Sequence, residues 1–151
     1  MGTRSLTYVY DGETPIMCMY RQYDGYLSGH GQELANFLNE LTIGNGISGK
    51  PELFSFANGM GCLAAQMIVN FKKSPGGFYI YPVEMNQDCW QDYEYHVYED
   101  TVIVKNPDQV IFNGTWNEFR DFCYNTVTEW GKHWRCLLTN SPTCVILEPL
   151  N

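Results

Sequence analysis

Short runs of apolar and β-branched residues mark the first part of the chain. Segments 5–10 (SLTYVY) and 16–23 (IMCMYRQY) are such runs, and they flank a turn that begins Asp11-Gly12. An Asp-Gly turn between two runs of this kind is typical of a β-hairpin. The sequence therefore predicts that the chain begins with two paired strands.

Three segments have the apolar spacing of a helix. The first is 31–42, in which the apolar residues at spacings of three and four are Leu34, Phe37, Leu38 and Leu41. The second is 60–72, which is apolar on more than one side and is expected beneath the sheet. The third is 115–130, where Thr115 and Glu118 have the spacing of a capping box.

The remaining β-rich runs complete the predicted order of elements. Strands are expected at 78–83, 93–98, 101–105 and 110–112, with a last hairpin from 135–138 and 144–147. The glycine-rich segment 43–58 is expected to be a loop. This order predicts an α+β fold over the single domain 1–151, with an antiparallel or mixed sheet and about three helices packed mainly on one face.

Charge and composition narrow the classes of partner. Seventeen acidic residues against nine basic ones give a net charge of −8, which argues against binding of a nucleic acid polymer. The sequence has no apolar run of signal-peptide or membrane-spanning length, and its six cysteines are scattered. We therefore expect a cytoplasmic protein with reduced thiols, no membrane partner and no cofactor.

The first segment with candidate chemistry lies between the first hairpin and the first helix. It contains Arg21, Tyr23, Asp24, Tyr26 and His30 among several glycines. Arginine binds carboxylates and phosphates in a two-pronged manner, tyrosine rings stack on planar groups, and a helix N-terminus favours an anion. An alternative is that the arginine pairs with the aspartate and that the glycines only shape a turn.

The second segment is Asn58-Gly59-Met60-Gly61, directly before the second helix. Its small residues would leave the backbone amides of a helix start open to phosphate or ribose oxygens. The alternative is that Gly61 allows another backbone to pack closely. Arg4 joins the candidate site because pairing of the first two strands would bring it near Arg21 or Tyr23.

Catalytic and metal-binding patterns are weak in this sequence. Cys62 and His30 are the only thiol and imidazole that we would pair as a nucleophile and its base. His133 and Cys136 have ligand-like spacing but no partner pair for zinc. We assign no catalytic residue and no metal ligand, and we lean against an enzyme.

Several sequence blocks resemble a group of short uncharacterised proteins from phages, other viruses and bacteria. They are MGTRSLT at 1–7, YRQYDGY at 20–26, SGHG at 28–31 and NGMGCLAAQ at 58–66. The group has no established activity, so the resemblance assigns no residue a role. It implies a viral origin and, by analogy with small viral proteins that bind host molecules, an anti-defence role in the cytoplasm of a host cell.

Three hypotheses about function follow. The leading one is a non-catalytic, homo-oligomeric protein that sequesters a small anionic ligand with a ring, such as a nucleotide immune signal. Its predicted binding residues are Arg4, Arg21, Tyr23, Asp24, Tyr26, His30, Asn58, Gly59 and Gly61. The second is a small hydrolase acting on a similar ligand. The third is a protein–protein inhibitor that uses the acidic, aromatic stretch 88–98.

Overall fold

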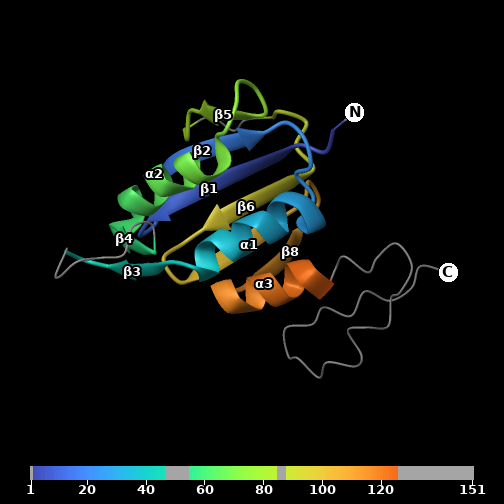
Figure 1. Cartoon of the computed structure of the whole chain (residues 1–151). Helices are drawn as coiled ribbons and strands as arrows, with labels where there is room; N and C mark the ends of the chain where they lie inside the picture. The colour runs from blue at the N-terminus through green and yellow to red at the C-terminus, as the bar shows by residue number, and fades with distance from the viewer. Residues whose placement is uncertain (1, 47–54, 85–87, 126–151) are drawn as a thin grey trace.

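The computed structural model describes residues 2–46, 55–84 and 88–125, which form a six-stranded sheet with helices on one face (Figure 1). The strands of this sheet are β1 (Ser5–Asp11), β2 (Thr14–Arg21), β5 (Phe78–Tyr81), β6 (Tyr93–Val97), β7 (Thr101–Lys105) and β8 (Val110–Thr115). The helical elements are the π-helical turn η1 (Leu27–Gly31), α1 (Gln32–Asn39), α2 (Gly59–Phe71) and α3 (Trp116–Asn125). The protein is therefore an α+β protein, as the sequence predicts.

The large sheet is mixed. Its strand order is β5-β2-β1-β6-β7-β8, and the central pair β1 and β6 is parallel, with Val9 opposite Val97. The other neighbouring strands are antiparallel. A parallel pair needs a long crossover between its strands, and here the connection between the β1–β2 hairpin and β6 contains η1, α1, α2 and β5.

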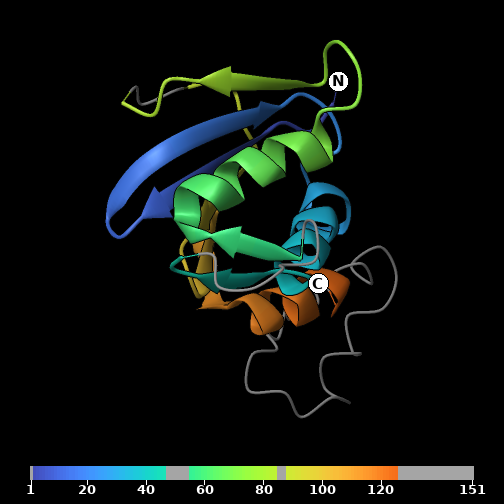
Figure 2. The ribbon, with the colours of Figure 1, turned by 60° about the vertical axis from the view of Figure 1, so that its left-hand side comes forward.

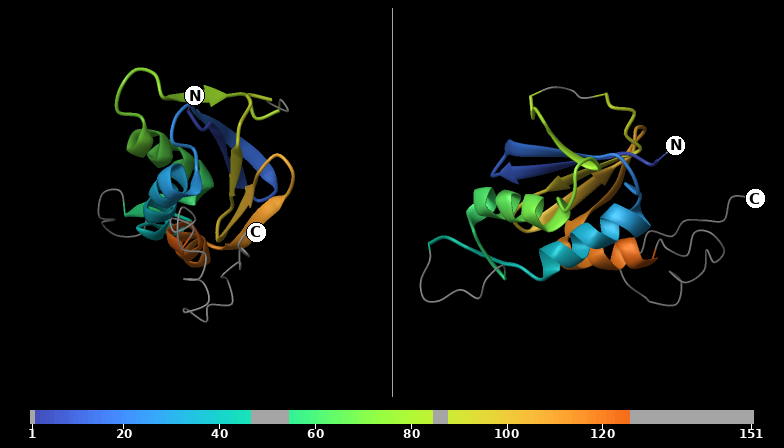
Figure 3. Two further views of the ribbon diagram at one scale, coloured as in Figure 1. Left: turned by 90° about the vertical axis from the view of Figure 1, so that its right-hand side faces the viewer. Right: turned by 45° about the horizontal axis from the view of Figure 1, so that its top comes forward.

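The helices of the described residues all lie on one face of this sheet (Figure 2). Alternate residues of β1 point to opposite faces. Val9 lies in the core on the helix side with Met19 and Tyr95, whereas Leu6 belongs to a smaller cluster on the opposite side. We call this opposite side the helix-free face. Figure 3 shows the two layers edge-on.

The smaller cluster on the helix-free face consists of Leu6, Tyr8, Cys18 and Tyr20. Val83 and Cys89, from the connection between β5 and β6, pack against it. That connection therefore shields the β1–β2 part of the helix-free face from solvent.

Local sequence signals account for the helices. Leu34 and Leu38 are buried, and Phe37 and Leu41 pack against the core, which confirms the predicted apolar side of α1. At the start of α3 the backbone N–H of Glu118 donates to Thr115 Oγ1 (3.2 Å), and the N–H of Thr115 donates to Glu118 Oε2 (3.0 Å). These reciprocal bonds form the predicted capping box.

The structure differs from the predicted elements most clearly in two places. The segment 43–58, expected to be a loop, contains parts of β3 (Thr42–Gly44) and β4 (Phe56–Asn58), which pair in parallel as a separate small sheet. The first helix begins with the π-helical turn rather than at residue 31. The predicted tail hairpin, 135–138 and 144–147, lies outside the described residues. Within the described ranges, no helix is long and apolar enough to cross a membrane.

Candidate functional site

The first glycine-rich segment forms a buried polar cluster between the sheet and α1. Arg21 is the last residue of β2, and one of its guanidinium nitrogens, Nη1, donates to Glu33 of α1 and lies 3.1 Å from His30 Nδ1. Its Nε donates to the carbonyl of Tyr23 (2.6 Å). His30 Nε2 is 2.7 Å from Thr7 Oγ1. This cluster of Thr7, Arg21, His30 and Glu33, which we call the Arg21–His30 cluster, joins the four elements β1, β2, η1 and α1.

The hydrogen bonds of His30 define its tautomer. A guanidinium only donates, so Nδ1 of the imidazole accepts from Arg21, and Nε2–H donates to the Thr7 hydroxyl. Burial, together with the smaller effect of the positive charge of Arg21, lowers the pKa of His30 to about 3. His30 is therefore a neutral structural residue and not a cation available to an anionic ligand.

Arg21 is also unavailable as an anion-binding group. Its side chain is buried, its guanidinium lies over the ring of Phe78 at 5.0 Å, and its charge is paired with Glu33. The alternative pairing with Asp24 does not occur; that carboxylate instead accepts from the Tyr26 hydroxyl (3.3 Å).

The second glycine-rich segment lies at the other end of the helix layer. His30 contacts Phe71, the last residue of α2, with ring centroids 5.1 Å apart, whereas Gly59 is the first residue of that helix. Thirteen residues of α-helix span about 20 Å. Figure 1 accordingly shows the start of α2 beside β4, far from the start of α1.

Within the second segment the polar groups bond locally. Asn58 Oδ1 accepts from the backbone N–H of Gly46 (2.7 Å). Gly59 has φ of +79°, which favours glycine, but a Cβ added to Gly61 would have no heavy atom within 4 Å. The alternative that Gly61 permits a close backbone approach is therefore wrong.

Arg4 is separated from Arg21 by the sheet itself. Its guanidinium Nη1 donates to the carbonyl of Cys89 (3.2 Å), which packs on the helix-free face, while Arg21 points to the helix side. Pairing of β1 and β2 does place Ser5 opposite Arg21. Arg4 directly precedes Ser5, the first residue of β1, so its side chain points to the opposite face.

The predicted ligand-binding residues therefore do not converge. Arg21 and His30 meet in a buried cluster, and Asp24 and Tyr26 meet in the adjoining loop. The rest of the predicted set lies elsewhere. Asn58, Gly59 and Gly61 are at the N-terminal end of α2, and Arg4 is on the opposite face of the sheet. Tyr23 is 55% exposed and lies in the loop between β2 and η1. The proposed pairing of Cys62 with His30 fails for the same reason, because Cys62 lies in the first turn of α2.

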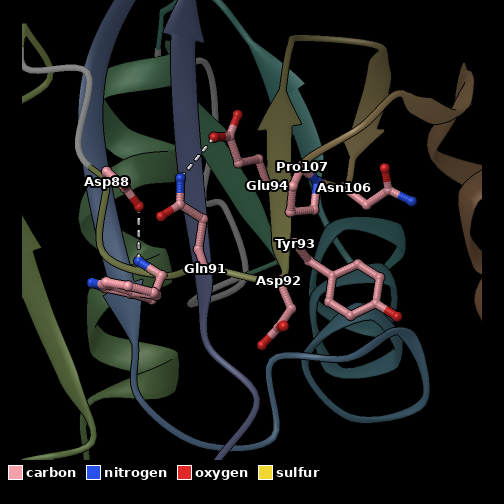
Figure 4. Close-up of a pocket in the computed structure, with 8 residues that line it drawn as sticks. Asp88, Gln91, Asp92, Tyr93, Glu94, Asn106 and Pro107 are labelled. Carbon is pink, nitrogen blue, oxygen red and sulfur yellow. Dashed lines mark hydrogen bonds between the residues drawn. The ribbon is translucent and has the colours of Figure 1, made fainter.

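A pocket of about 490 Å³ lies instead at the end of the sheet where β1 and β6 begin (Figure 4). Its lining residues are Asp88, Trp90, Gln91, Asp92, Tyr93, Glu94, Asn106 and Pro107. The segment before β6 and the turn between β7 and β8 therefore build it together. We call it the 88–94 pocket.

Hydrogen bonds hold the carboxylates of the 88–94 pocket in place. Glu94 accepts from Gln91 Nε2 (3.0 Å) and from His96 Nε2 (3.0 Å), and the bond from His96 is the main cause of the lowered pKa of Glu94. Asp92 Oδ2 accepts from the backbone N–H of Arg4 (3.2 Å). Glu94 and Asp92 are thus acceptors fixed by hydrogen bonds, and the lowered pKa of Glu94 keeps its carboxyl negatively charged at neutral pH.

Two cations lie close to the 88–94 pocket without pairing with its carboxylates. Lys105 is opposite Glu94 on β7 and helps to lower the pKa of that carboxyl, and Arg4 contacts the Cys89 carbonyl. Within the described ranges, no lysine or arginine forms an ion pair with Asp88, Asp92 or Glu94. The lining itself carries three acidic side chains and no basic one.

Trp90 is the most exposed large hydrophobic residue in the described part of the chain, with 81% of its surface accessible. Its backbone has φ of +60°, which is unusual for a residue other than glycine. The neighbouring Asp88 Oδ1 accepts its N–H (3.2 Å), and Gln91 Oε1 accepts the N–H of Cys89 (2.8 Å). These local bonds hold an indole at the rim of an acidic pocket.

The fold and this pocket define the class of protein: an α+β protein with a mixed sheet and an acidic, aromatic surface pocket. Comparisons with known proteins give no match to a family model, to a curated protein or to a solved structure. Within the described residues, no group of three His, Cys, Asp or Glu side chains is placed to hold a metal ion.

Part of this pocket lies in a stretch that the sequence already singles out by its composition. The stretch 88–98 was proposed as a protein-binding surface because it is acidic and aromatic. Asn106 and Pro107 were not identified, because only the return of β7 beside β6 brings them to the pocket. Glu33 was also missed as the partner of Arg21, although an acidic residue in the first turn of a helix is a recognisable signal.

Proposed function

We propose that the protein is a non-catalytic binding protein whose partner presents a positively charged segment to the 88–94 pocket. The observation that supports this is the pocket lining, in which three carboxylates surround a hollow beside the exposed indole of Trp90. Carboxylates attract lysine and arginine side chains, and an indole face adds a cation–π contact. Exposed tryptophan is also enriched among residues that dominate protein interfaces.

The hypothesis of an anionic nucleotide ligand receives less support. It stays a prediction, because no observation tests the ligand, but its two arginines lie on opposite sides of the sheet and one is paired with Glu33. An anion in the 88–94 pocket would be repelled by Asp88, Asp92 and Glu94. The pocket therefore favours the protein-binding hypothesis.

A titration monitored by amide NMR spectra tests the proposed function. The probe is a seven-residue peptide with one central arginine among alanines and glycines, and its control has citrulline, the uncharged analogue, at that position. We expect shifts confined to residues 88–94 and 106–107, weaker binding in 300 mM than in 50 mM salt, and loss of the shifts in Trp90→Ala and Asp92→Asn.

Tyr23→Ala is the matched control, because Tyr23 is also an exposed aromatic residue but lies in the loop before η1. It should leave the titration unchanged. Equal shifts with the citrulline peptide, or shifts around Tyr23 instead of the 88–94 pocket, would contradict the proposed function.

A further inference from the structure

β5 forms one edge of the six-stranded sheet (Figure 1). Within the described ranges, it pairs with β2 on one side and with no strand on the other. The segment 76–83 (GGFYIYPV), which contains this strand, has no charged residue. Its Tyr79 is 44% exposed and its Ile80 is 56% exposed. An uncharged edge strand with exposed apolar side chains is a template for pairing with another strand.

The register of β5 shows which of its backbone groups point away from β2. The N–H of Gln22 donates to the carbonyl of Gly77 (2.9 Å), so these two residues form a hydrogen-bonded pair. Such pairs alternate with non-bonded pairs along antiparallel strands. Consequently the N–H and C=O groups of Phe78 and Ile80 point outward from the sheet.

The outward groups of Phe78 have partners within the chain. The Phe78 N–H donates to the carbonyl of Gly76 (2.8 Å), and the Phe78 carbonyl accepts from Lys72 Nζ (2.8 Å). In the part of the chain that the structure describes, the outward groups of Ile80 form no such bond. Pro82, two residues further on, has no N–H. Ile80 is therefore the position at which this edge offers both a donor and an acceptor.

We propose that the protein forms a two-fold symmetric dimer in which β5 pairs antiparallel with β5 of a second copy, centred on Ile80. In this register each Ile80 N–H donates to the Ile80 carbonyl of the other copy. Phe78 lies opposite Pro82 of the second copy. The proline lacks the N–H that the Phe78 carbonyl would otherwise accept, but that carbonyl already accepts from Lys72. The edge is thus complementary to itself, as a closed two-fold contact requires.

Side chains on both faces of the sheet fit the same register. Ile80 is on the helix side with its β2 neighbour Met19, so the two exposed Ile80 side chains contact each other across the dimer. On the helix-free face, Tyr79 lies opposite Tyr81 of the second copy. Tyr81 stacks on Tyr20, with ring centroids 5.0 Å apart and planes at 4°. The dimer extends this aromatic pair across the interface.

Charge favours a second copy as the occupant of this edge. Because the chain has a net charge of −8, two copies repel each other wherever their acidic surfaces meet. The uncharged segment 76–83 avoids this repulsion. Lys72 Nζ is bound beside Phe78, which in the centred register lies opposite Pro82, two residues before the exposed Glu84. A cation of one copy and a carboxylate of the other are therefore at the same end of the contact.

Sedimentation equilibrium of the full chain tests the dimer. At concentrations up to about 300 µM, which suit a small interface, we expect a mass of twice the 17.4 kDa of the chain. Ile80→Lys places two like charges opposite each other and should raise the dissociation constant at least about 100-fold. Val110→Lys is the matched control, because Val110 is 53% exposed on the other edge strand, β8. It should remain dimeric, and far-UV circular dichroism confirms that both variants fold.

Cysteine cross-linking tests the register. Ile80→Cys places two thiols at opposite positions whose Cα atoms are about 5.5 Å apart, which a disulfide spans. Oxidised glutathione is the oxidant, and each disulfide formed releases two molecules of reduced glutathione. Tyr79→Cys is the control, because the two copies of residue 79 are diagonal neighbours about 7–8 Å apart, beyond the usual span of a disulfide. Peptide mapping should find the link between the introduced residues in the first variant alone.

The outcomes are decisive for the dimer. A wild type that stays monomeric overturns it, and so does a dimer that survives Ile80→Lys or that Val110→Lys dissociates, because the contact then lies elsewhere. Cross-linking of Tyr79→Cys as efficient as that of Ile80→Cys overturns the centred register. These results are independent of the proposed function, because the contact and the 88–94 pocket share no residue.

Discussion

At the residue scale, the most informative side chain is His30. The sequence indicates a polar residue in a glycine-rich loop, and the structure shows a buried neutral imidazole between Arg21 and Thr7. Burial and the neighbouring guanidinium both disfavour its charged form. We therefore expect His30 to contribute to the free energy of unfolding, and we expect this contribution to depend on pH.

The pH dependence of unfolding tests this role. The pKa of His30 is about 3 in the folded protein and about 6.5 when unfolded, so between these values the unfolded state binds one proton more. Stability is then fully present above about pH 6.5 and falls as pH drops, by about 1.4 kcal/mol per pH unit. Urea unfolding at pH 7.5, 6 and 5 should show this decline in the wild type and a shallower one in His30→Gln; identical slopes would contradict it.

The bond from His30 to Thr7 has its own consequence. Thr7→Val keeps the shape of the side chain but removes the hydroxyl that accepts from His30 Nε2–H. A buried donor without a partner costs about 1–3 kcal/mol. Chemical unfolding should show a loss in this range, while Thr101→Val, at a half-buried position on β7, should change stability by about 0.5 kcal/mol or less.

At the element scale, the start of α2 shows that two neighbouring glycines have different roles. Gly59 has φ of +79°, a conformation that side chains with a Cβ adopt at a cost. Gly61 lies within the helix, and a Cβ there would meet no other atom within 4 Å. The two glycines look alike in the sequence, but their backbone conformations differ: Gly59 has a positive φ and Gly61 is helical.

Alanine substitution at each glycine tests this difference. Gly61→Ala should stabilise the protein by about 0.5–1 kcal/mol, because alanine favours the helix and restricts the unfolded chain. Gly59→Ala should destabilise it by about 1–2 kcal/mol, because of the positive φ. Thermal and urea unfolding of the two variants check this, and a change of the same sign in both would contradict it.

The pairing of elements explains why the first predicted site does not form. Each glycine-rich segment precedes a helix, and that much follows from sequence. The direction in which each helix crosses the sheet, however, is set by how the apolar side of that helix packs in the core. Consequently the C-terminal Phe71 of α2, and not its N-terminus, contacts His30.

At the scale of the whole molecule, the sheet separates a packed helix side from the helix-free face, and the 88–94 pocket lies at the end of the sheet where β1 and β6 begin. Cys18 and Cys123 are buried on opposite sides of this sheet. Burial raises the pKa of Cys18 to about 11 and raises the pKa of Cys123 strongly as well. Both thiols should therefore be unreactive in the folded protein.

Alkylation followed by peptide mapping checks this expectation. At pH 8 we expect iodoacetamide to label Cys18 and Cys123 at least about 100-fold more slowly in the folded protein than in urea, because the reactive thiolate is depleted and covered. Cys62, which is only half-buried, is the internal comparison and should be labelled faster than either. Rapid labelling of Cys123 in the folded state would contradict the packing of α3 against the sheet.

The sequence alone determined the local elements of this protein. The Asp-Gly turn, the apolar spacing of α1 and the Thr115–Glu118 capping box are interactions between residues near in the chain, so their patterns are readable without a structure. The tertiary structure decided the parallel pairing of β1 with β6, the separation of Arg4 from Arg21 and the meeting of Asn106 with Glu94. These depend on contacts between distant residues, and a shift of one residue along a strand moves a side chain to the opposite face.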